Sequence, residues 1–122
     1  MSVQKIADQL VTFCRQGKFE EAVKELYSPN IVSIEPAGSP FERAEGIEAY
    51  HKKGEAWQKS LEAFHGIEVS DPIVADNLFT CSMTLDVTTK GQPRSKSSEI
   101  CLYEVKDGKI VLEQFFYSMP EG

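Results

Sequence analysis

The hydrophobic pattern of this chain changes near Phe64 from mainly helical to strand-like, and this change limits the fold more than any other feature. Before that point, apolar residues recur every three or four positions, as in amphipathic helices, and after it they alternate with polar residues, as in strands. The clearest alternation covers residues 78–88 and places Phe79 and Met83 on one face. Helices followed by strands predict an α+β fold, with the helices packed on one face of a curved antiparallel sheet.

Three helices and a short strand are predicted in the first half. Ser2 is a suitable N-cap for a helix that ends at Gly17, and a shorter amphipathic helix follows and stops before Pro29. A β-branched segment at residues 31–35 predicts the strand, and helical spacing returns over residues 46–61. Four further strands are predicted at residues 65–69, 78–88, 97–105 and 110–118.

Length and composition exclude several classes of protein. The 122 residues predict one domain, 1–122, and no apolar run is long enough to cross a membrane. A net charge of −6 with few arginines argues against a nucleic-acid partner. The three cysteines lack the spacing of zinc ligands, and with no secretory signal the expected location is the cytoplasm, where they stay reduced.

The order of five short motifs resembles the NTF2-like, or SnoaL-like, superfamily, which includes ketosteroid isomerases and polyketide cyclases. The resemblance covers nearly the whole chain and implies a cystatin-like cone, with three N-terminal helices packed on the sheet. The motifs are Gly17-Lys18-Phe19-Glu20, Leu26-Tyr27-Ser28-Pro29-Asn30, Glu35-Pro36-Ala37-Gly38, Gly46-Ile47-Glu48-Ala49 and Asp107-Gly108-Lys109-Ile110.

The resemblance also indicates which catalytic groups the chain has and which it lacks. In the ketosteroid isomerase pattern, the acid before Pro-x-Gly moves the substrate proton, and Glu35 holds this place. The two places for donors to the enolate oxygen are filled by Leu10 and Cys101. Since loss of one such donor costs about 2.7–4 kcal/mol elsewhere, steroid isomerisation by that mechanism is not expected.

The turn of the last hairpin decides whether Glu113 or Gln114 faces the expected pocket. A three-residue turn at residues 106–108 pairs residue 101 with Glu113, whereas a two-residue turn at Asp107 and Gly108 presents Gln114 instead. The three-residue turn is favoured because it aligns Glu113 with the pocket-facing positions of the resembled family.

Strand alternation then gives a list of pocket residues. The candidate acids and bases are Glu35, Glu99, Glu113 and His65, since burial among apolar groups raises carboxylate pKa values toward neutrality. His65 is included because it shares a strand face with Ile67 and Val69. The expected ligand-binding residues are Tyr50, Trp57, Phe79, Met83, Cys101, Tyr103, Phe115 and Tyr117.

Simpler structural interpretations stand beside these candidates. The three glutamates fit equally well at strand ends, in water or paired with lysines. A lone inward histidine is more often a hydrogen-bonded core residue than a catalytic one. Cys81 and Cys101, which fall opposite each other if the chain turns at Gly91, are interpreted as packing residues and not as a disulfide. Two histidines on different elements do not predict a metal site.

Two functions follow from this list. The first is a cofactor-independent acid/base enzyme, of isomerase, cyclase or dehydratase type, acting on a small hydrophobic carbonyl compound. The alternative is a non-catalytic protein that binds a small molecule in the same pocket. The resemblance and the apolar residues Ile110, Leu112 and Phe116 on the far face of the sheet also predict a homodimer through the sheet.

Overall fold

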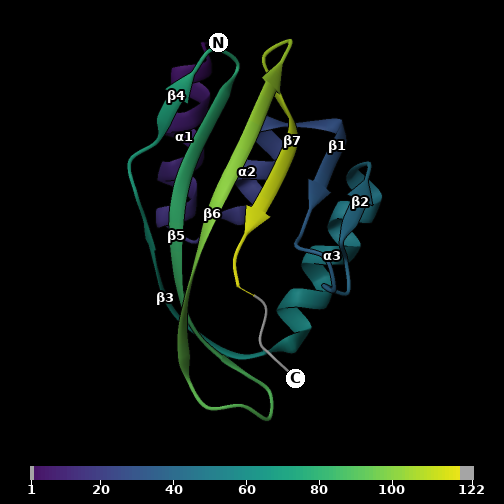
Figure 1. Ribbon diagram of the computed structural model, residues 1–122, viewed down its shortest axis with the longest axis vertical. Coiled ribbons are helices and arrows are strands. Elements are labelled where there is room, and N and C mark those ends of the chain that lie inside the picture. The colour runs from purple at the N-terminus through teal and green to yellow at the C-terminus, as the bar shows by residue number, and fades with distance from the viewer. Residues whose placement is uncertain (1, 119–122) are drawn as a thin grey trace.

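The computed structural model describes residues 2–118 and places three helices against one curved, seven-stranded sheet (Figure 1). The helices are α1 (Val3–Arg15), α2 (Phe19–Leu26) and α3 (Ile47–Ser60). The strands are β1 (Tyr27–Ile34), β2 (Arg43–Glu45), β3 (Leu61–Val69), β4 (Ile73–Ala75), β5 (Leu78–Thr89), β6 (Ser95–Lys106) and β7 (Lys109–Phe116). The predicted α+β cone is confirmed, and the short strands β2 and β4 are additions to it.

The sheet order is β2-β1-β7-β6-β5-β3, with β4 paired to β5. The prediction of a purely antiparallel sheet is wrong, because β1 pairs with β7 in parallel while the other pairs are antiparallel. In Figure 1, α1 and α2 lie behind the sheet and α3 lies beside β1 and β2. The parallel pair brings the end of β1 beside the middle of β7, which places residues from distant parts of the chain in one region.

The predicted caps of the first helix are present. The Ser2 hydroxyl accepts a hydrogen bond from the backbone nitrogen of Lys5 at 3.1 Å, and Gly17 adopts a positive φ of 70° just beyond the helix. The buried face of α1 carries Ile6, Leu10 and Cys14 toward the sheet. Full burial of an aliphatic side chain such as Ile6 contributes about 1.5–3 kcal/mol, so this face holds α1 on the sheet.

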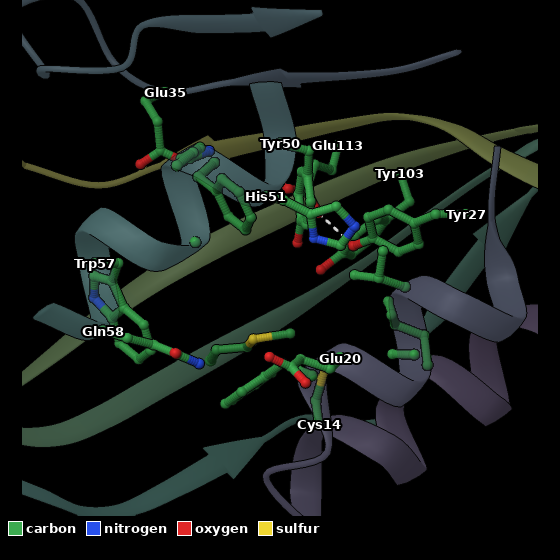
Figure 2. A pocket seen from close by; sticks show the side chains of 18 of the residues that line it. Cys14, Glu20, Tyr27, Glu35, Tyr50, His51, Trp57, Gln58, Tyr103 and Glu113 are labelled. Carbon is green, nitrogen blue, oxygen red and sulfur yellow. Dashed lines mark hydrogen bonds and ion pairs between the residues drawn. The ribbon is translucent and has the colours of Figure 1, made fainter. Parts of the chain in front are cut away.

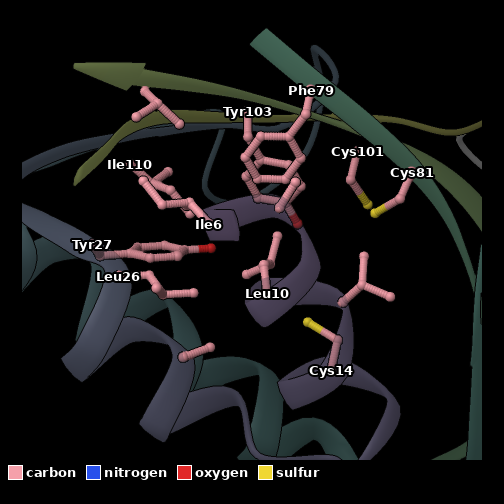
Figure 3. Packing of buried hydrophobic residues seen from close by; sticks show 14 of the residues in the cluster. Ile6, Leu10, Cys14, Leu26, Tyr27, Phe79, Cys81, Cys101, Tyr103 and Ile110 are labelled. Carbon is pink, nitrogen blue, oxygen red and sulfur yellow. The ribbon is translucent and has the colours of Figure 1, made fainter. Parts of the chain in front are cut away.

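The core joins α1 and α2 to the long strands β5 and β6 (Figure 3). Phe79 and Tyr103 pair across these strands and stack with ring centroids 4.8 Å apart. Cys81 and Cys101 are the next inward pair, as predicted, and Figure 3 shows their sulfur atoms directed toward each other. Both thiols are free and buried, so they fill the core as small apolar side chains do.

The last hairpin differs from the favoured prediction in its turn. Asp107 and Gly108 both have positive φ values, 51° and 76°, and Lys106 pairs with Lys109, so the turn has two residues. An Asp-Gly pair favours this geometry because both central positions require a left-handed backbone. A register shift follows between Glu104 and Val105.

That register shift determines which face of β7 reaches the interior. Val105 pairs with Ile110 but Glu104 pairs with Leu112, so Val111 is the extra residue of a β-bulge. The bulge moves Glu113 opposite Tyr103 and returns it to the inner face. The predicted pairing of residue 101 with Glu113 is wrong, since Cys101 pairs with Phe115, but the predicted inward direction of Glu113 is confirmed.

Candidate functional site

A cavity of about 290 Å³ lies between the three helices and the inner face of the sheet (Figure 2). Its apolar walls come from α1, α2, α3 and the strands β5, β6 and β7. Glu35, Glu99 and Glu113, the three predicted acids, all line it. The site therefore combines apolar walls with carboxylates from β6, from β7 and from the residue that follows β1.

Glu35 follows β1 directly and is mostly buried, with 13% of its side chain exposed. Its Oε2 atom lies 2.7 Å from the Nζ atom of Lys53 on α3, and its Oε1 atom accepts a hydrogen bond of 2.7 Å from the Tyr117 hydroxyl. Burial, together with the neighbouring Glu35 carboxylate, raises the pKa of Tyr117 to about 12. Tyr117 therefore stays protonated and acts as a donor to Glu35.

Glu113 is the most deeply buried acid of the site, at 2% exposure. Ser33 donates a hydrogen bond of 2.8 Å to its Oε1 atom, and the Tyr27 hydroxyl bonds to its Oε2 atom. Burial raises the pKa of Glu113, while the bonds from Tyr27 and Ser33 and the charge of Lys53 oppose that rise. Figure 2 shows Glu113 beside Tyr27, with Glu35 farther along the cavity.

Lys53 connects these two carboxylates. Besides its ion pair with Glu35, its Nζ atom donates a hydrogen bond of 2.6 Å to the Ser33 hydroxyl, which in turn donates to Glu113. The ammonium also lies 4.9 Å from the centroid of the Phe115 ring, within cation–π range. The side chains thus form one hydrogen-bonded array that runs Tyr117–Glu35–Lys53–Ser33–Glu113–Tyr27.

Glu99 on β6 stands apart from this array. Its Oε1 atom is 3.7 Å from the sulfur of Cys101, a distance that allows only a weak contact. Burial, followed by the charge of Glu35, raises the pKa of Glu99 to about 7. This carboxyl group therefore changes charge near neutral pH.

The predicted wall residues divide into two groups. Tyr50, Trp57, Met83, Tyr103 and Phe115 line the cavity. The other three do not line the cavity as predicted. Phe79 and Cys101 belong to the buried core, and Tyr117 contacts the site through its hydrogen bond to Glu35. Phe79 lies behind Tyr103, since their stacked rings put Tyr103 between Phe79 and the cavity space.

The prediction that His65 points into the pocket is wrong. His65 is exposed, and its Nε2 atom lies 2.8 Å from the hydroxyl oxygen of Thr88. The register of β3 against β5 shifts between Phe64 and Gly66, so a bulge at His65 breaks the alternation that the sequence suggested. His65 therefore faces away from the interior although Val69, on the same strand, is buried.

Sequence reasoning missed three polar residues of the array, namely Tyr27, Ser33 and Lys53. Helical spacing offered a signal for Lys53, since it lies three residues after Tyr50 and four before Trp57 on the inward stripe of α3. Alternation from Glu35 offered a signal for Ser33, two positions earlier on β1. Tyr27 begins β1, which is longer than the predicted strand, and no pattern in the neighbouring sequence indicated that its hydroxyl belongs to the site.

Two further observations bear on the kind of site. Within residues 2–118, no three His, Cys, Asp or Glu side chains are placed so that they could hold a metal ion. Among the helices of that same stretch, none is long and apolar enough to span a membrane.

The arrangement supplies the parts of acid/base chemistry. A carboxylate paired with an ammonium, Glu35, and a carboxyl held by neutral donors, Glu113, face one cavity in different environments. Pairs of carboxyl groups in unlike environments around one cavity are the usual arrangement for separate acid and base roles. The apolar part of the lining lowers the local dielectric constant, which strengthens electrostatic interactions of both groups.

Comparison with known proteins agrees with this architecture. A protein of Mesorhizobium loti, provisionally called a SnoaL-like polyketide cyclase, is 33% identical over 96% of this chain and all of its own, with a TM-score of 0.90. A Xanthomonas campestris protein of unknown function with a cystatin-like fold is 17% identical, with 98% and 92% of the two chains covered and a TM-score of 0.82.

A third structure, an NTF2-like protein of unknown function from Burkholderia pseudomallei, is 12% identical, with 97% and 92% of the chains covered and a TM-score of 0.80. No curated protein sequence matches the chain. The model of the SnoaL-like domain family matches residues 1–117. Together with the relative from Mesorhizobium loti, this match shows that the chain belongs to the SnoaL-like domain family.

Proposed function

We propose that this protein is a cofactor-independent acid/base enzyme that acts on a small hydrophobic carbonyl compound. The observation that carries the proposal is that Glu35 and Glu113 open onto one apolar cavity and are joined through Lys53 and Ser33. The cavity, at about 290 Å³, suits a ligand near the small end of the usual range.

Glu35 is the proposed base. It takes a proton from the carbon next to the carbonyl group. The electron pair of that C–H bond forms a C=C bond, and the π pair of the C=O bond moves onto the oxygen to give an enolate. Its pairing with Lys53 and Tyr117 fixes the carboxylate in one orientation, which favours catalysis because a base must lie within hydrogen-bond reach of its proton.

Lys53 and Glu113 are the proposed partners for the developing negative charge. An ammonium group has three N–H bonds, and the known contacts of Lys53 with Glu35 and Ser33 use two. The third bond is available to a ligand oxygen in the cavity, which Lys53 lines. Glu113, whose pKa burial raises, would return a proton to the product from its protonated form.

Lys53 can take over the role of the two donors to the enolate oxygen that are missing at Leu10 and Cys101. Leu10 lines the cavity with an apolar side chain, and Cys101 lies in the core and offers only a weak thiol donor. A charged donor stabilises an oxyanion more strongly than a neutral one, so one ammonium can substitute for neutral donors. Isomerisation, cyclisation and dehydration share this first proton transfer, and all three remain within the proposal.

Exchange of substrate protons with solvent deuterium tests the proposal without knowledge of the final product. Small ketones and 1,3-diketones are incubated with the protein in D₂O, and deuteration next to the carbonyl is followed by NMR. We expect catalysed exchange, and a loss of about 100-fold or more in Glu35→Gln, the range that general bases contribute. Glu62→Gln, at an exposed position of β3, is the matched control and should retain the wild-type rate.

The second candidate function is non-catalytic binding of a small molecule. It is favoured by the engagement of both Glu35 oxygens, one by Tyr117 and one by Lys53, since an oxygen that already accepts a hydrogen bond is less available to a substrate proton. A ketone that binds in the cavity without any exchange by the wild-type protein would select this function and reject the enzyme.

We also propose that a second copy covers the outer face of the sheet. Ile100 and Phe116 pair across β6 and β7 and are 50% and 46% exposed. Exposed apolar groups placed side by side favour association, and an isologous contact between two such faces gives a symmetric dimer.

A further inference from the structure

The charges that line the cavity are strongly unequal. Five of the lining side chains are glutamates, against one lysine and one histidine. Lys53 is already committed to Glu35 and Ser33, and His51 is exposed on α3. The glutamates are Glu20, Glu35, Glu55, Glu99 and Glu113.

The inner glutamates differ in how their hydrogen bonds are satisfied. Glu35 is bonded to Lys53 and Tyr117, and Glu113 to Tyr27 and Ser33. For Glu99, the contact within residues 2–118 is the thiol of Cys101 at 3.7 Å, which is long for a hydrogen bond. Of these three inner glutamates, Glu99 is thus the one that the described residues leave without a strong donor.

The position of Glu99 lets a ligand reach it. Glu99 lines the cavity from β6, directly opposite Met83 of β5, and Met83 lines the same space. Burial of a hydrogen-bond acceptor at this position costs free energy unless a donor bonds to it. The raised pKa of Glu99 agrees with that lack of a strong donor, because burial and the charge of Glu35 outweigh the opposing effects of the Cys101 contact and the Lys53 charge.

We infer that the ligand of this cavity carries a hydrogen-bond donor, a hydroxyl or an ammonium group, that bonds to Glu99, and that ligands carrying a carboxylate are rejected. The inference rests on the proposed function, because it names the substrate class of the same site. A carboxylate placed beside Glu99 meets like charge, and the remaining N–H bond of the lining cation Lys53 is the one proposed above for the carbonyl oxygen of the same ligand.

Four acetophenones that differ only at the para position test this inference. The probes are 4-(hydroxymethyl)acetophenone, 4-(aminomethyl)acetophenone, 4-ethylacetophenone and 4-acetylbenzoate, and their dissociation constants are measured by NMR titration at pH 7.5. We expect the better of the hydroxyl and ammonium probes to bind at least about tenfold more tightly than both the ethyl and the carboxylate probes. Which of the two binds better identifies the donor.

The variant Glu99→Gln should bring the four dissociation constants to within about threefold of one another, because an amide both accepts and donates. Glu62→Gln should keep the wild-type order. The inference would be overturned if the wild-type protein bound 4-acetylbenzoate as tightly as, or more tightly than, the better of the hydroxyl and ammonium probes. This result does not depend on the folding of a variant. An unchanged order of affinities in Glu99→Gln would overturn it as well.

The same probes separate this inference from the proposed function. All four carry an acetyl group whose protons can exchange, so binding and exchange are recorded on the same samples. The expected affinities without exchange would overturn the enzyme and leave the ligand class standing. Exchange that depends on Glu35, combined with preference for the carboxylate probe, would overturn the ligand class alone.

Discussion

The Nζ atom of Lys53 on α3 lies 2.7 Å from the Oε2 atom of Glu35, which directly follows β1. The two side chains are only 15% and 13% exposed, so the pair is largely shielded from water. Ion pairs in such places hold position more than they add stability, because each charge loses hydration when it is buried. The pair fixes α3 against the end of β1 and orients the proposed base.

Removal of the Lys53 charge should destabilise the protein measurably. In Lys53→Met the Glu35 carboxylate keeps the bond from Tyr117 and loses its cation. We expect the free energy of unfolding, measured with urea, to fall by about 1–3 kcal/mol. Lys52→Met, at an exposed position on the same helix, is the control, and an equal loss in both variants would show that the pair has no structural role.

Loss of the Tyr27 hydroxyl should weaken the fold through Glu113. In Tyr27→Phe, the Oε2 atom of a fully buried carboxyl group loses its donor, at a cost of about 1–3 kcal/mol in the free energy of unfolding. Ser33→Ala removes the donor to the other oxygen and should cost a similar amount. Wild-type stability of Tyr27→Phe, measured by urea unfolding, would mean that this hydrogen bond contributes nothing.

Glu99 should make stability fall as pH rises. Burial raises its pKa from about 4.5 to about 7, so the folded chain holds this proton more tightly than the unfolded chain. The associated stability is complete below about pH 4.5 and is lost as pH rises through 7, to a total of about 3 kcal/mol.

Glu99→Gln, which has no charge to bury, isolates this effect. The variant should match the wild type near pH 4.5 and exceed its free energy of unfolding by up to about 3 kcal/mol at pH 8.5. Urea unfolding across this pH range gives the comparison. A difference between the two proteins that stays constant with pH would contradict the assignment of the raised pKa to Glu99.

The inward direction of Glu113 shows what strand periodicity can and cannot predict. Alternation along β7 is readable from the sequence, but the face depends on a count of residues from the turn. The Asp107-Gly108 turn has two residues, which alone would turn Glu113 outward, and the bulge at Val111 reverses the face again. No residue type in this segment marks the bulge, so the sequence predicted the correct face from an incorrect turn.

For His65 and Lys53, the side-chain direction expected from the local pattern was wrong. His65 was expected inside because it alternates with Ile67 and Val69, and one bulge at that residue places it in solvent. Lys53 was overlooked because a lysine usually marks an exposed helix face. Its aliphatic stem crosses the inner stripe of α3, and a buried acid then holds the ammonium there. Local patterns predict elements, whereas partners across the fold decide such positions.

The proposed dimer gives a prediction about mass in solution. Light scattering should report the mass of two chains at micromolar concentration, because association buries the apolar outer face of β6 and β7. Phe116→Lys places a charge on the exposed side of β7 and should yield the mass of one chain with an unchanged circular dichroism spectrum. A wild-type mass of one chain at micromolar concentration would remove the proposal.

The central claim is that Glu35 and Glu113 act together in one cavity, and a double-mutant cycle on proton exchange tests it most directly. Rates of deuterium incorporation are compared for the wild type, Glu35→Gln, Glu113→Gln and the double variant. Groups that act as a unit give losses that do not multiply, so the double variant should be no slower than the slower single variant. Losses that multiply, or a single variant with the wild-type rate, would contradict the account.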